Sequence, residues 1–138
     1  MDIRNSILEC VGNTPLVALD RFAPPGDGRG RVLGKLELLN PYSVKDRPAL
    51  TMLREAQARG EIAPGRTTIL EATSGNTGIA LAAIARIKGY PITIMMPESV
   101  SIERRQMLQI FGADLVGQGD WTSFITWAAV GWSFSAWW

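Results

Sequence analysis

The first residue whose type and setting could do chemistry is Lys45, in the run Asn-Pro-Tyr-Ser-Val-Lys-Asp-Arg at residues 40–47. The pattern places it where a strand ends and a helix begins, so the backbone on both sides is constrained. Desolvation lowers the pKa of a lysine amine and makes it nucleophilic, which suits a residue that binds a carbonyl group covalently. A lysine beside Asp46 and Arg47 is also, and more commonly, found on a solvated surface, so these residues alone leave both interpretations open.

A second candidate is the run Thr-Ser-Gly-Asn-Thr-Gly at residues 73–78, between an expected strand and an apolar helix. Gly75 and Gly78 permit a close approach of the backbone, and a helix start presents N–H groups with a partial positive charge. Ser74 and Thr77 add hydroxyl donors. The run therefore suits an anion, either a phosphate or a substrate carboxylate, unless it is an ordinary capped helix start.

Alternating strands and helices must position these two runs. Strands are expected at 32–38, 67–72, 92–96 and from 115, and helices at 48 to about 60, 79 to about 89 and after 101. Strands separated by helices of about 10–15 residues indicate a parallel sheet, and ligands bind at the carboxyl ends of such strands. Residues 73–78 fall there. The predicted fold is α/β, an open doubly wound parallel sheet covered on both faces.

The composition narrows the class of protein. A chain of 138 residues with 46% apolar and 20% charged residues suits one globular domain. The net charge of +1 gives no electrostatic reason to expect nucleic acid or a membrane as partner. Without His and with a single Cys10, His-based catalysis, His-ligated metals, Cys-rich zinc sites and an intrachain disulfide are excluded. No signal peptide is visible, so a cytoplasmic protein is expected.

The last residues differ from the rest. All five Trp residues lie from Trp121 onward, and no charged residue follows Asp120. Residues 121–138 have no helical period and are fewer than the roughly 20 apolar residues that a membrane span needs. We interpret residues 117–138 as a Trp-rich tail outside the native fold, with a membrane or partner contact as the alternative.

Four ordered motifs resemble the cysteine synthase branch of the fold-type II enzymes that use pyridoxal 5'-phosphate (PLP), whose fold is that of tryptophan synthase β. Besides 40–47 and 73–78, they are Gly-Asn-Thr-Pro-Leu at 12–16 and Met-Pro-Glu at 96–98 with Ser-Ile-Glu-Arg-Arg at 101–105. Related dehydratases usually carry His at the position of Thr77. The resemblance favours an O-acetylserine or O-phosphoserine sulfhydrylase, with cystathionine β-synthase as the alternative.

The resemblance also implies roles for the matched positions. Lys45 would bind PLP covalently and later take the α-proton of the substrate, and Asn76 would hydrogen-bond the phenolic oxygen of the cofactor. The substrate carboxylate would be bound by Thr73, Ser74, Gly75 and Thr77. The implied partners are an amino acid substrate, a sulfide donor and a second copy of the chain in a homodimer.

Two features depart from the family pattern. Only Tyr42 stands between Pro41 and Ser43, where the family has two residues; one residue fewer can shift Lys45 by about 3.3 Å. Family members are more than twice as long, and their second half supplies a phosphate loop and the partner of the pyridine nitrogen. Residues 1–39 are expected to pack on that half, and residues 40–116 to form the amino-terminal α/β domain. The chain is then either a half-site that works with another polypeptide or a truncated, inactive fragment.

Overall fold

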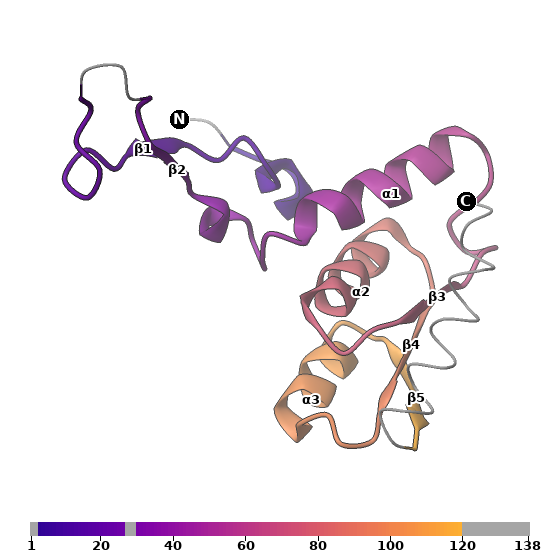
Figure 1. Cartoon of the computed structure of the whole chain (residues 1–138). Coiled ribbons are helices and arrows are strands. Elements are labelled where there is room, and N and C mark those ends of the chain that lie inside the picture. The colour runs from indigo at the N-terminus through magenta and orange to yellow at the C-terminus, as the bar shows by residue number, and fades with distance from the viewer. Residues whose placement is uncertain (1–2, 27–29, 120–138) are drawn as a thin grey trace.

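The computed structural model describes residues 3–26 and 30–119. Its amino-terminal part holds a 3-10 helix (Ile7–Cys10), an antiparallel hairpin of β1 (Leu16–Ala18) and β2 (Leu33–Lys35), and a second 3-10 helix (Glu37–Leu39). The remainder alternates α1 (Asp46–Ala58), β3 (Ile69–Ala72), α2 (Asn76–Lys88), β4 (Ile92–Pro97), α3 (Ile102–Ile110) and β5 (Asp114–Gln118). In Figure 1 the hairpin stands away from the unit formed by the helices and the second sheet.

The second sheet is parallel, with strand order β3-β4-β5. In the central strand, Ile94 pairs with Glu71 of β3 and with Leu115 of β5. Almost every residue of β4 is buried, as a continuous apolar run in a parallel sheet predicts. The predicted α/β class with a parallel sheet is confirmed.

The helices that connect these strands, α2 and α3, lie on one side of the sheet (Figure 1). The pattern predicts cover on both faces, and the strand order explains the difference. Each crossover moves to the next strand in the same direction, and right-handed crossovers of that kind place their helices on the same face.

The core surrounds α2. Residues 80–85 of this helix are all buried, as its nearly uniform apolar sequence predicts. It ends at Gly89, whose φ of 77° is the left-handed conformation that glycine adopts at helix ends. Leu50 and Leu53 of α1 belong to the same buried cluster, and α1 packs against α2.

Several boundaries differ from the predictions for local reasons. The strand expected at 32–38 is only β2, because the side-chain amide of Asn40 bonds the Glu37 carbonyl at 2.8 Å and closes a turn. The short strand β1 was not predicted, since three residues leave no period. Ser101 precedes α3 as expected, but its side chain makes no capping hydrogen bond.

The carboxyl-terminal boundary also moves. Within β5, Gly117 pairs with Met96 and Gln118 with Pro97, so the boundary expected at residue 117 falls inside a strand. Residues 120–138, the rest of the expected Trp-rich tail, lie outside the described residues. Among the helices of residues 3–26 and 30–119, none is long and apolar enough to cross a membrane.

Candidate active site

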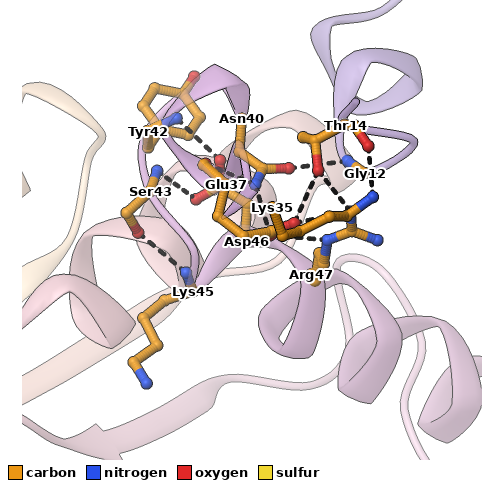
Figure 2. Close-up of polar contacts among 10 residues, drawn as sticks. All are labelled: Gly12, Thr14, Lys35, Glu37, Asn40, Tyr42, Ser43, Lys45, Asp46 and Arg47. Carbon is orange, nitrogen blue, oxygen red and sulfur yellow. Dashed lines mark hydrogen bonds and ion pairs between the residues drawn. The ribbon is translucent and has the colours of Figure 1, made fainter. Parts of the chain in front are cut away.

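Lys45 ends a turn at residues 40–45, the lysine turn, directly before α1. The buried carboxylate of Asp46 accepts the backbone N–H groups of Tyr42 at 2.8 Å and Ser43 at 3.0 Å. The Ser43 hydroxyl accepts the N–H of Lys45 at 3.1 Å. The turn is thus closed by hydrogen bonds although it holds only Tyr42 between Pro41 and Ser43. The side chain of Lys45 is exposed and extends away from the neighbouring polar groups (Figure 2).

A second contact fixes the outer side of the lysine turn. The ring of Tyr42 meets the ring of Phe111 edge to face, with centroids 5.3 Å apart. Phe111 follows α3 directly, so the turn is tied to both the first and the last helix of the α/β unit. Although the turn is one residue shorter than in the family pattern, its aromatic side chain, Tyr42, has a packing partner.

Four polar side chains beside the lysine turn form a cluster that we call the brace: Thr14, Glu37, Asn40 and Arg47 (Figure 2). Arg47 donates two parallel hydrogen bonds to the Glu37 carboxylate, from Nε at 2.8 Å and from Nη2 at 2.9 Å. The Thr14 hydroxyl donates to the same carboxylate at 2.7 Å, and the Asn40 amide donates to it at 2.9 Å. Arg47 first and Thr14 second lower the pKa of Glu37 to about 2, so this carboxylate stays ionised at neutral pH.

The amino-terminal turn at residues 12–15, the opening turn, docks on the brace. Gly12 and Asn13 have φ of 85° and 49°, left-handed values that these two residue types tolerate best. The N–H of Gly12 donates to the Asn40 side chain at 2.8 Å, and the Lys35 ammonium donates to the Thr14 carbonyl. A Cβ added at Gly12 would lie 3.1 Å from Nη1 of Arg47. The backbone conformation therefore favours glycine here, and a larger residue would also press on the end of the Arg47 side chain.

The run at residues 73–78, the glycine loop, is held mainly by backbone and packing. The N–H of Thr73 donates to the Met95 carbonyl of β4 at 3.0 Å, and its hydroxyl accepts the N–H of Gly75 at 3.3 Å. A Cβ at Gly78 would lie only 2.6 Å from the Thr73 methyl group, whereas one at Gly75 would meet nothing within 4 Å. The predicted close approach at Gly78 is thus made within the chain itself, and open space lies beside Gly75.

The glycine loop presents groups that suit an anion. The N–H groups of Asn76 and Thr77 lie in the first turn of α2, where helix geometry provides no acceptor and the dipole is positive. Ser74 and Thr77 are half-buried, and Asn76 is exposed. Arg104 of α3 donates to the Ser74 carbonyl, which adds a cation at the edge of the loop.

The two candidate runs lie at the starts of helices that pack together. Lys45 precedes α1 and the glycine loop leads into α2, and in Figure 1 both helices begin on the same side of the molecule. The sequence did not reveal the brace, because its members are up to 33 residues apart and follow no period. One indirect signal was present in the sequence, because Thr14, Asn40 and Arg47 all lie in the motifs at residues 12–16 and 40–47 that resemble the family.

Comparison with known proteins identifies the family of the chain. The family described as "Pyridoxal-phosphate dependent enzyme" matches residues 7–129. Cysteine synthase B of Pseudomonas aeruginosa is 53% identical over 112 residues, which cover 80% of this chain and 36% of that protein. Cystathionine beta-synthase of Saccharomyces cerevisiae is 46% identical over 116 residues, which cover 83% of this chain and 23% of that protein.

A solved structure of an O-acetyl serine sulfhydrylase is also similar to this chain. The crystal structure of O-acetyl serine sulfhydrylase isoform 3 from Entamoeba histolytica matches with a TM-score of 0.79 and 38% identity, over 96% of this chain and 40% of that chain. The chain thus spans well under half the length of these three proteins. The family match also continues past residue 117, where the Trp-rich tail was expected to begin. The chain belongs to the family of pyridoxal-phosphate dependent enzymes, and within that family it resembles the cysteine synthases.

Proposed function

We propose that this chain carries the lysine and the substrate loop of a cysteine synthase-type site. The proposed reaction is a β-replacement, in which the acetate of O-acetylserine (or the phosphate of O-phosphoserine) leaves the β-carbon and sulfide takes its place. Lys45 would hold PLP, and Asn76 would donate a hydrogen bond to the cofactor. The observation that carries the proposal is that the exposed Lys45 and the glycine loop stand at the starts of two helices that pack on each other.

The described residues fit the proposed cofactor and substrate. The open space beside Gly75 leaves room against the loop backbone, next to the first turn of α2, whose first N–H groups have no acceptor within the helix. A bound PLP supplies an electron sink that stabilises negative charge at the substrate α-carbon. The amine of Lys45 is exposed, so it is free to bond the cofactor and, when released, to take the α-proton on Nζ.

The glycine loop would hold the substrate. Its carboxylate would accept hydrogen bonds from the loop, with Thr73, Ser74, Gly75 and Thr77 as the binding residues. The partial positive charge at the start of α2 favours this anion, an effect typically worth about 0.3–1 kcal/mol at an exposed site. Binding by one end would fix the α-carbon relative to Lys45, and such orientation is a large part of what enzymes contribute to rate.

Reductive labelling tests the assignment of the lysine. Purified protein is mixed with PLP, reduced with borohydride and digested, and the modified lysine is identified by mass spectrometry. The chain contains two matched controls, because Lys35 donates to the Thr14 carbonyl and Lys88 donates to Gln57 at 3.0 Å. We expect the fastest labelling at Lys45, and we expect Lys45→Ala to remove that fast label and leave only the slow background on the other two lysines. Faster labelling of Lys35 or Lys88 than of Lys45 would show that the proposal is wrong.

The substrate needs a separate test, because both a cysteine synthase and a cystathionine beta-synthase resemble the chain at similar identity. The protein is incubated with PLP and sulfide plus either O-acetylserine or O-phosphoserine, and in parallel with serine plus homocysteine. From this chain alone we expect no cysteine above the rate of free PLP, because the resemblance assigns the phosphate loop to the family's second half. When the chain is completed with that half, we expect cysteine from the first set, dependent on Lys45. Cystathionine from the second set would favour the alternative activity instead.

Two further expectations belong to the proposal. We infer a homodimer from the resemblance, and sedimentation at several concentrations tests it. We also propose a cytoplasmic location, which agrees with the exposed free thiol of Cys10, since thiols stay reduced in that compartment. Cell fractionation with an antibody to the chain tests the location.

A further inference from the structure

The opening turn belongs to the motif at residues 12–16, to which the proposed reaction assigns no role. Its residues contact the brace, and the brace contacts both ends of the lysine turn. Asn40 lies at the start of that turn and Arg47 lies two residues past Lys45, and both donate to the carboxylate of Glu37. One side chain therefore fixes both ends of the segment that carries Lys45.

The brace is built for a defined geometry. The Arg47 guanidinium meets Glu37 with two parallel hydrogen bonds, an arrangement that a lysine ammonium cannot reproduce. Nη2 of Arg47 also donates to the Thr14 hydroxyl at 3.0 Å, so the opening turn is held by the same group. Thr14 and Asn40 are only 6% and 5% exposed, which limits the movement of either partner.

From this geometry we propose that Arg47, acting through Glu37 and Thr14, is a positioning residue for Lys45. The inference rests on the proposed function, since it assumes that Lys45 binds PLP. Arg47 is not a catalytic residue, because the side chain of Lys45 extends away from the brace (Figure 2). Its effect is on where the turn lies, and a displacement of about 1 Å can cost a reacting group about a hundredfold in rate. The opening turn is then part of the site despite its distance in sequence.

The test measures where the label goes rather than turnover. The full chain is mixed with PLP and trapped with borohydride, and the initial rates of labelling at Lys45 and Lys88 are compared within the same sample. Lys88 serves as the internal reference. It lies at the end of α2, whereas the brace holds the segment before α1. We expect Arg47→Lys to lower the ratio of Lys45 to Lys88 label by at least about tenfold.

A matched control tests whether any ion pair on α1 would have this effect. Arg59 makes the same two-bonded contact with Glu61, at 2.6 and 2.9 Å, just past the other end of the helix. We expect Arg59→Lys to leave the labelling ratio within about twofold, since exposed pairs contribute little. If the labelling ratio in Arg47→Lys also stays within about twofold of the parent, the positioning role is overturned.

A second pair of variants separates positioning from loss of folding. Thr14→Ser keeps the hydroxyl of the brace and Thr14→Val removes it with little change in shape. We expect Thr14→Ser to retain the parent ratio and Thr14→Val to lose it, with cooperative unfolding retained in both. Equal ratios in these two variants would contradict the inference. If the parent chain shows no preference for Lys45 at all, the proposed function fails and the inference fails with it, which is a different result from either of these.

Discussion

The two halves of the candidate site are held in different ways. The lysine turn depends on charged and polar side chains, above all the carboxylates of Asp46 and Glu37. The glycine loop depends on a backbone hydrogen bond to β4 and on the contact of Gly78 with the Thr73 methyl group. The position of the lysine should therefore respond to charge, pH and hydrogen-bonding groups, whereas the loop should respond to volume.

The largest loss of stability is expected when the carboxylate of Asp46, which accepts two N–H groups of the lysine turn, is removed. Asp46→Ala leaves the N–H groups of Tyr42 and Ser43 unpaired near a buried position. At about 1–3 kcal/mol for each unsatisfied group, the free energy of unfolding should fall by about 2–6 kcal/mol. Urea denaturation measures it, and Asp46→Asn, which keeps one acceptor oxygen, should lose less. An alanine variant as stable as the asparagine variant would mean that the turn is held by something else.

The corresponding change in the glycine loop is one of volume. Gly78→Ala adds a Cβ only 2.6 Å from the Thr73 methyl group, and overpacking of this kind costs about 1–3 kcal/mol. Gly75→Ala is the matched control, because its Cβ would meet nothing within 4 Å. Thermal unfolding should separate the two variants clearly. The contrast between the halves would disappear if both alanines had the same midpoint.

A smaller effect should appear with pH in the lysine turn. The folded pKa of Glu37 is about 2, below its ordinary value of 4.5, because Arg47 and Thr14 favour the ionised form. A lowered pKa of an acid contributes stability that is fully present above about pH 4.5 and is lost as the pH falls towards 2. Glu37→Gln should remove this slope from the acid unfolding curve. Gly78→Ala should keep the slope of the parent, and an identical slope in both variants would contradict the assignment to Glu37.

The smallest effect concerns Glu71, which lies in β3 just before the glycine loop. Burial raises the pKa of this carboxyl, because its ionised form is poorly solvated. A raised pKa of an acid means that stability increases as the pH falls through it, the opposite sign to Glu37. Glu71→Gln should therefore stabilise the protein slightly at pH 7 and flatten that increase. Glu55→Gln, on the exposed side of α1, is the control and should change neither quantity.

The elements that local sequence controls were predictable, and contacts across long separations were not. The buried helix α2 and its end at Gly89 follow from an apolar run and one glycine, and both are present. The brace joins Thr14 to Arg47 across 33 residues, and no periodic pattern marks such a pair. The unusual composition after residue 120 led us to end the fold too early. Gly117 is instead a strand residue, and a Cβ there would lie 3.2 Å from Cγ of Glu98.

The brace also bears on the order in which the protein is made. All of its members precede β3, whose first residue is Ile69, so the complete brace is synthesised before any strand of the parallel sheet. The interval between Arg47 and Ile69 is about 20 residues, or roughly 1–4 seconds at a synthesis rate of about 5–20 residues per second. Hairpins and helices form within about 10 microseconds. The lysine turn therefore enters the growing chain together with all its amino-terminal partners, before any residue that forms the parallel sheet.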